Sequence, residues 1–173
     1  MIVAMSTPRL SETSYVVLGL LERMERATPY DLKQLAAIST ANFWALPHTQ
    51  IYTECERLAA AGLLAEEREP AGRRRRIYSL TDDGRDALER WRSEPAGDLY
   101  ELRDVGTLKL FFGADPARLA QAQLTAHRER LQHYEQLLDE LGRNDAPRGF
   151  LLALELGIGQ EREFIRFWSG LAG

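Results

Sequence analysis

The sequence predicts a mainly α-helical protein with one small β-hairpin: an N-terminal winged helix-turn-helix followed by a second, all-helical domain. Three observations lead to this fold class. Signals for three short helices fall within residues 11–62, and two short runs around a Pro/Gly turn follow them. From residue 115 onward, apolar residues repeat in heptads. The stretch "RSEPAGD" is the expected linker, which gives domains of residues 1–94 and 95–173.

The three N-terminal helices are predicted from their first and last residues. Ser11 stands at the N-cap of the first helix, and Thr28 with Pro29 begins the second. The third is "PHTQIYTECERLAAAGLL", with Pro47 near its start and Gly62 at its end. Three short helices with brief polar connections are typical of a helix-turn-helix.

A β-hairpin is predicted next, because "LLAEEREP" and "RRRIYSL" flank the turn "PAGR". Alternation along the second run places Arg76 and Tyr78 on the same face. Thr81 is predicted to cap a fourth helix. Gly84 lies near the start of this helix, where a glycine is expected to be tolerated. Three helices, a hairpin and a helix make a winged helix, with the arginines 73–76 at the tip of its wing.

Charge and composition limit the classes of partner. The net charge is −4, and the 22 cationic residues include only two lysines, so any contact with a polyanion must be local and made by arginine. A single cysteine excludes an intramolecular disulfide framework and fits a reducing compartment. No segment approaches the roughly 18–20 apolar residues of a membrane span, so we expect a cytoplasmic protein without membrane contact.

Catalytic and metal-binding patterns are missing from the sequence. It contains no GxSxG, HExxH, phosphate-binding glycine loop or dinucleotide fingerprint, so an enzyme is not expected. Cys55 falls on the apolar face of the third helix, where a small core residue is expected. The spacing of His48, His127 and His133 does not favour a metal site. We therefore predict no metal and no cofactor.

The third helix carries the pattern of a DNA-recognition helix. If its apolar residues face inward, the outward residues are Thr49, Gln50, Thr53, Glu56 and Arg57, with Tyr52 at the flank. Gln can bond adenine in the major groove, and arginines on a wing can reach the minor groove or phosphates. Glu56 is discordant, because a carboxylate beside phosphates weakens binding, so we place it beyond the groove. The combination predicts a double-stranded DNA contact.

The second domain is predicted to contain a long helix from Asp115-Pro116 to about Gly142. Its apolar seam recurs at alternating three and four residues through Ala117, Ala120, Leu124, His127, Leu131, Tyr134, Leu138 and Leu141. The helix after it has similar spacing and contains Ile165 and Trp168. Internal packing could supply the partner of this seam, but so much apolar helix surface favours a homodimer.

Several of these residues together resemble the PadR family of bacterial transcriptional regulators. The resemblance lies in "FWALPHTQIYTECERLAAAGLL" and "GRRRRIYSLTDDGRDALERW", at Phe43, Trp44, His48, Gln50, Ile51, Tyr52, Leu58, Gly62, Leu63, Arg76, Tyr78, Leu80, Thr81 and Gly84. The tail, with "LRDVGTLKLFFGA" and "AHRERLQHYEQ", is similar to the longer-tail subgroup that includes phenolic-acid-responsive repressors. Pro47 and Thr49 depart from that subgroup, so its operator preference does not carry over.

The resemblance implies a DNA-binding domain over residues 1–94 and a dimerisation domain over residues 95–173. The DNA-facing residues it implies are Tyr30, His48, Thr49, Gln50, Tyr52 and Thr53, with Arg73, Arg74, Arg75 and Arg76 as wing contacts. The first helix and the tail would build the dimer, through Leu18, Leu21, Leu124, Leu131, Tyr134, Leu138, Ile165 and Trp168.

The predicted function is a homodimeric, ligand-responsive repressor that binds a near-palindromic operator. A small-molecule effector is expected, and an aromatic-rich interior between the domains could house it, with Trp44, Trp91, Phe111, Phe112 and Trp168. Each of these residues is more simply explained as core, so no ligand residue is assigned. The alternatives are a MarR-like regulator, a winged-helix module that binds an acidic protein partner, and a small cytoplasmic enzyme.

Overall fold

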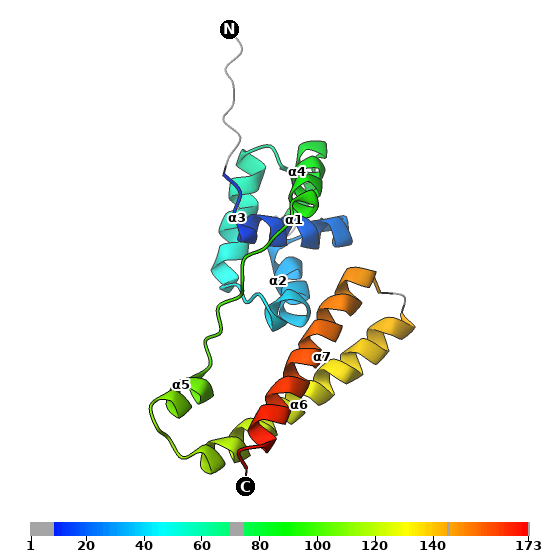
Figure 1. Cartoon of the computed structure of the whole chain (residues 1–173). Helices are drawn as coiled ribbons and strands as arrows, with labels where there is room; N and C mark the ends of the chain where they lie inside the picture. The colour runs from blue at the N-terminus through cyan, green and yellow to red at the C-terminus, as the bar shows by residue number, and fades with distance from the viewer. Residues whose placement is uncertain (1–8, 70–74, 145, 173) are drawn as a thin grey trace. The chain divides into compact units, whose positions relative to one another are not determined.

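The computed structural model describes residues 9–69, 75–144 and 146–172. The chain divides into two compact units, Met1–Asp98 and Leu99–Gly173. Each unit is described by itself below (Figure 1). The roles predicted for residues 1–94 and 95–173, DNA binding and dimerisation, stay predictions.

The first unit is the predicted winged helix-turn-helix. Its elements are α1 (Glu12–Met24), β1 (Arg26–Ala27), α2 (Pro29–Ile38), a 3-10 helix η1 (Thr40–Asn42), α3 (His48–Ala60), β2 (Leu64–Arg68), β3 (Arg76–Leu80) and α4 (Asp82–Ser93). Strands β2 and β3 form the predicted hairpin, with Arg68 opposite Arg76. The sequence did not predict β1, which pairs with β3 and makes an antiparallel sheet in the order β1-β3-β2. Two residues are too few to produce a period-2 pattern.

Local hydrogen bonds fix the predicted helix starts. Thr28 Oγ1 accepts a hydrogen bond from the Asp31 N–H at 3.3 Å, and Asp31 Oδ2 accepts one from the Thr28 N–H at 2.9 Å. At α4, Thr81 Oγ1 accepts from the Gly84 N–H at 3.1 Å and donates to the Gly62 carbonyl at 2.8 Å. Gly62 has a φ of 78°, a conformation that favours glycine at the end of a helix. These caps satisfy backbone groups that the helices leave unpaired.

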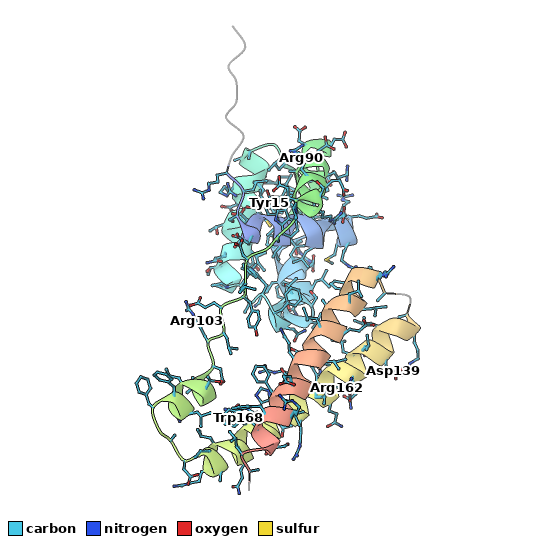
Figure 2. All side chains as sticks on the ribbon, in the orientation of Figure 1. Tyr15, Arg90, Arg103, Asp139, Arg162 and Trp168 are labelled. Atoms are coloured by element: carbon cyan, nitrogen blue, oxygen red, sulfur yellow. The ribbon has the colours of Figure 1, made fainter. Side chains whose placement is uncertain are left out.

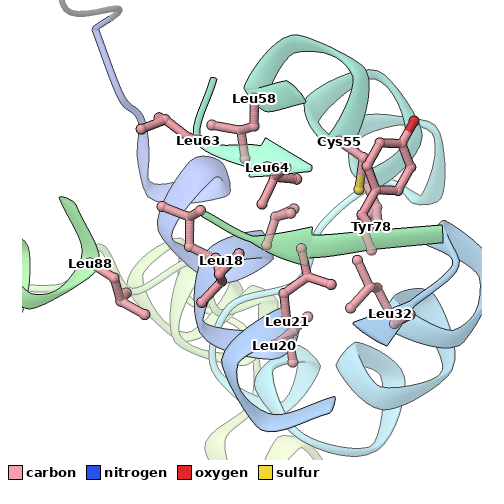
Figure 3. Packing of buried hydrophobic residues seen from close by; sticks show 14 of the residues in the cluster. Leu18, Leu20, Leu21, Leu32, Cys55, Leu58, Leu63, Leu64, Tyr78 and Leu88 are labelled. Carbon is pink, nitrogen blue, oxygen red and sulfur yellow. The ribbon is translucent and has the colours of Figure 1, made fainter. Parts of the chain in front are cut away.

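In the first unit, side chains from α1, α2, α3, α4 and the sheet meet in one core (Figure 3). Leu18 and Leu21 of α1 are fully buried in it, next to residues of α2, α3 and β3. Both were predicted to contact a second chain. Neither side chain has exposed surface within its own unit, and a role at a dimer interface stays a prediction. Their burial holds α1 against the helix-turn-helix.

Cys55 lies in this core and is fully buried, as the sequence indicated. Burial, followed by the charges of Glu54 and Glu56, raises the pKa of its thiol to about 12. Because the thiolate is the reactive form, we expect the native protein to resist a disulfide reagent such as DTNB at pH 8. In denaturing urea the same thiol should react at once. Rapid stoichiometric reaction of the folded protein would contradict this burial.

The second unit consists of α5 (Val105–Phe111), α6 (Pro116–Arg143) and α7 (Arg148–Ser169). Asp115 caps α6 as predicted, since its Oδ1 accepts hydrogen bonds from the N–H groups of Ala117 at 2.9 Å and Arg118 at 3.3 Å. The predicted long helix is therefore confirmed. Figure 1 shows α6 and α7 side by side as an antiparallel pair.

The heptad seam of α6 packs against α7 of the same chain. Leu124 and Trp168 are buried in one cluster, and Tyr134 is buried in another with residues of α7. Leu131 and Leu138 pack against the second cluster, and Ile165 packs against the first. Helix α7 thus supplies a partner for this seam within the same chain, as the alternative of internal packing allowed. Leu131, Leu138 and Ile165 are only partly buried, and their contact with a second chain stays a prediction.

Candidate nucleic-acid interface

Helix α3 separates its residues onto two faces, as predicted. Its inward face contributes Ile51, Cys55 and Leu58 to the core. Thr49, Gln50 and Thr53 are exposed on the other face. Thr53 Oγ1 donates to the carbonyl oxygens of Thr49 and Gln50, both at 3.2 Å, so its hydrogen is committed to the helix. Gln50 is therefore the exposed amide at the start of this face.

The start of α3 has a backbone suited to an anion. Pro47 is its N-cap, and no side chain caps it. Unpaired N–H groups at a helix N-terminus favour phosphate. His48 is the first residue of α3, but its side chain lies outside the described residues. Tyr52 on α3 and Tyr30 on α2 are both exposed, and the Tyr30 hydroxyl accepts a hydrogen bond from Gln34 at 3.2 Å.

Arg57, which the sequence placed on the outward face, holds α3 to α1. Its guanidinium donates to Glu54 at 2.6 Å and 2.9 Å and to Ser14 Oγ at 2.9 Å. Burial alone would raise the pKa of Glu54, but the hydrogen bonds and charge of Arg57 outweigh it and lower that pKa. The pair of Glu54 and Arg57 has the i, i+3 spacing of neighbours on a helix, but it was not predicted, whereas the contact of Arg57 with Ser14 joins residues far apart along the chain. The guanidinium of Arg57 is therefore engaged in contacts with Glu54 and Ser14.

The described wing arginines face glutamates. Arg75 Nε lies 3.7 Å from Glu69 Oε2. Arg76 Nη1 donates to Glu56 Oε1 at 2.6 Å, which ties β3 to α3. The other two predicted wing contacts, Arg73 and Arg74, lie outside the described residues. Glu56, the discordant carboxylate on the recognition face, thus has a partner.

The aromatic residues expected around an effector belong to both units, and each is described within its own unit. Trp91 stacks on Tyr15 at a ring distance of 4.7 Å, within the first unit. Phe111 and Phe112 contact each other at 5.2 Å and are exposed. Trp44 is exposed in the helix-turn-helix, and Trp168 is buried in the core of the second unit. The effector site expected between the domains stays a prediction, and no effector residue is assigned.

A buried polar pair joins α6 to α7, and the sequence did not indicate it. His127 Nδ1 lies 2.5 Å from Glu161 Oε2, and the His127 ring stacks on Phe164 at 4.6 Å. Arg130 lies 3.5 Å from the other carboxylate oxygen. Glu161 escaped notice because only the return of α7 brings it opposite His127. The pair fixes the register of the two helices.

The structure offers no metal-binding or membrane-spanning feature in the residues it describes. Nowhere within residues 9–69, 75–144 and 146–172 do three or more His, Cys, Asp or Glu side chains gather as ligands. Across the same ranges, no helix is long and apolar enough to cross a membrane.

An exposed recognition helix beside an antiparallel wing defines a winged helix-turn-helix of the DNA-binding class. Residues 17–90 match the family model described as the transcriptional regulator PadR-like family. Residues 102–169 match a second model, described as virulence activator alpha C-term. Residues 17–90 therefore form a PadR-like domain, in agreement with the resemblance and the fold predicted from the sequence.

Known relatives agree with this assignment. The negative transcriptional regulator PadR of Bacillus subtilis (strain 168) is 28% identical over 131 residues, which cover 73% of this chain and 69% of the relative. The crystal structure of Bacillus subtilis PadR in complex with operator DNA superposes with a TM-score of 0.82 at 22% identity, covering 95% of this chain and 98% of that one. The crystal structure of the same protein in complex with p-coumaric acid superposes with a TM-score of 0.77 at 21% identity, covering 95% of this chain and 97% of that one.

Proposed function

We propose that this chain is a ligand-responsive repressor that binds a near-palindromic operator as a homodimer. The observation that carries the proposal is the exposed polar face of α3, with Gln50 at its start, next to the wing. A family of transcriptional regulators and a relative that binds operator DNA support it. Such a protein acts in the cytoplasm, where the DNA is. Its family makes a regulatory role a better hypothesis than an enzymatic one.

In this proposal, α3 enters the major groove and reads base edges. The DNA-facing residues are Tyr30, His48, Thr49, Gln50, Tyr52 and Thr53. The arginines 73–75 contribute charge near phosphates. Two copies would place their recognition helices in successive major grooves, which explains a near-palindromic site.

The dimer surface we propose lies on the second unit. That unit exposes large apolar side chains that its own helices leave uncovered: Leu99, Tyr100, Leu102, Val105, Leu108, Phe111, Phe112, Leu152, Leu156 and Phe167. Exposed apolar surface of this extent is typical of an interaction site. Burial against a second copy would remove it from water and stabilise the pair.

A small-molecule effector would regulate the dimer by binding one arrangement of the DNA-binding units better than the other. The relative that binds p-coumaric acid supports an effector of small-molecule class. Because reciprocal coupling is required, DNA should change the affinity for the effector by the same factor as the effector changes the affinity for DNA.

The test of the proposed function is fluorescence anisotropy with DNA from upstream of the gene for this protein and with a scrambled duplex. A preference for the native duplex that survives near-physiological salt supports a sequence-specific regulator. If both duplexes bound equally and near-physiological salt abolished the binding, only phosphate contacts would be made to this DNA. Failure to bind either duplex would favour the alternative of a module for an acidic protein partner.

Gln50→Ala should reduce discrimination between the preferred site and a scrambled duplex by about 1–3 kcal/mol, because the amide pairs with a base edge. The measurement is the ratio of the two dissociation constants. Gln121→Ala, an exposed glutamine on α6, is the matched control and should leave the ratio unchanged. An unaltered ratio in Gln50→Ala would remove Gln50 from the readout.

A further inference from the structure

Glu56 is an unusual residue to find on a DNA-recognition face. Its side chain is 59% exposed, on the same side of α3 as Thr49 and Thr53. A carboxylate there repels the DNA backbone unless a cation neutralises it. The structure supplies that cation from the wing rather than from α3.

Arg76 is the neutralising group. Its Nη1 donates to Glu56 Oε1 at 2.6 Å, and its Nε lies 3.7 Å from Glu66 Oε1 on the neighbouring strand. The side chain starts at the first residue of β3, two positions before Tyr78, whose ring is buried in the core. The anchored strand therefore presents the guanidinium to α3.

Glu66 holds the other side of Arg76. It accepts a hydrogen bond from Arg68 at 2.9 Å and one from Tyr78 at 3.3 Å. The hydrogen bond from Arg68, together with the charge of Arg76, lowers the pKa of Glu66 and keeps it ionised. Two arginines thus face the carboxylates of Glu56 and Glu66, and the charges of this network sum to zero. The base of the wing offers no surplus positive charge to phosphate.

We propose that Arg76 is a positioning residue, which assists DNA binding by neutralising Glu56 and fixing the wing to the recognition helix rather than by contacting phosphate itself. The inference rests on the proposed DNA-binding function and revises one of its expected contacts. It also assigns Glu56 a role, because the carboxylate makes the orientation of the wing a condition for binding.

The experiment is a double-mutant cycle on DNA affinity with Arg76→Ala, Glu56→Gln and the double variant. The full-length protein is titrated against the duplex from upstream of its own gene and against a scrambled one. Arg76→Ala should weaken binding about tenfold, because it leaves an unpaired carboxylate at the interface. In the Glu56→Gln background, the same substitution should cost less than about twofold. Glu56→Gln alone should bind at least as tightly as the unmodified protein.

Two further variants separate positioning from other roles. Arg76→Lys keeps the charge and should recover most of the affinity that Arg76→Ala loses. Arg75→Ala is the matched control, because Arg75 faces Glu69 instead of Glu56, and its effect should be the same in both backgrounds. Circular dichroism checks that each variant is folded. If Arg76→Ala is not, Arg76→Gln in both backgrounds replaces it.

Salt dependence provides an independent readout. Glu56→Gln and the double variant should have equal slopes of log affinity against log salt, because no cation in contact with phosphate is lost between them. An equal loss of affinity in both backgrounds, with a slope smaller by about 0.9, would make Arg76 a direct phosphate contact and overturn the inference. Unchanged affinity on removing Arg76 would overturn it too. If the unmodified protein binds neither duplex, the proposed function itself fails, an outcome distinct from these two.

Discussion

Trp168→Ala should destabilise the second unit by about 3–5 kcal/mol, the loss expected when a large aromatic side chain is removed from a core. Trp168 is 1% exposed near the end of α7 (Figure 2). It packs with Ala120 and Leu124 of α6, and Leu110 of α5 lies against the same cluster. Few neighbours could close so large a cavity, because the described residues of this unit form three helices.

Urea denaturation followed by far-ultraviolet circular dichroism measures this loss. Trp168→Phe is the control, because it keeps an aromatic ring and should lose much less. Sedimentation at several concentrations adds a second readout. If Trp168 lay in an interface between chains, its removal would promote dissociation and leave the helix content of the separated chains intact. That result would restore the dimer contact first predicted from sequence.

Gly84→Ala should destabilise the first unit by about 3 kcal/mol, at the upper end of the range for overpacking. A Cβ atom at Gly84 would lie 2.2 Å from the carbonyl oxygen of Leu63. That oxygen belongs to the backbone and accepts a hydrogen bond from the Thr81 N–H, so it cannot move freely. The structure therefore requires the glycine that the sequence suggested was only tolerated.

Gly19→Ala is the matched control for this prediction. Gly19 lies within α1, and a Cβ atom there would meet nothing within 4 Å. Alanine at such a helix position should stabilise the protein by about 0.5–1 kcal/mol. Thermal or urea unfolding of the two variants should consequently shift in opposite directions. If the stability of Gly84→Ala rose as that of Gly19→Ala does, α4 would not approach Leu63 as closely as the structure shows.

The helices illustrate what local sequence can predict. Thr28 and Thr81 cap helices through contacts only three residues away, and Asp115 does so over two and three residues. Such interactions depend on short spacing, so a single sequence contains all of their information. The strand β1 was not predicted, because two residues contain no pattern and only its pairing with β3, Arg26 with Ser79 and Ala27 with Tyr78, defines it.

Less of the candidate site could be predicted from the sequence. Helical periodicity alone placed Gln50 on the exposed face of α3 and Cys55 on the buried one. Periodicity could not show that Arg57 is committed to Glu54 and Ser14, nor that Glu56 is paired with Arg76. The pair of Arg57 and Glu54 lies within α3, but the contacts of Arg57 with Ser14 and of Glu56 with Arg76 depend on where α1 and the wing lie against α3.

The sequence by itself thus determined the helix boundaries, the hairpin, the exposed face of α3 and the resemblance of residues 17–90 to a PadR-like domain, since each depends on short-range spacing or on a contiguous motif. Only the tertiary structure decided which apolar and charged groups are already satisfied within the chain. It buried Leu18, Leu21 and Trp168, which had been expected at a dimer surface, and it paired Arg76 with Glu56. The physical reason is that an apolar stripe or a charge has the same pattern in sequence whether its partner comes from its own chain, from another chain or from DNA. Long-range packing alone selects the partner.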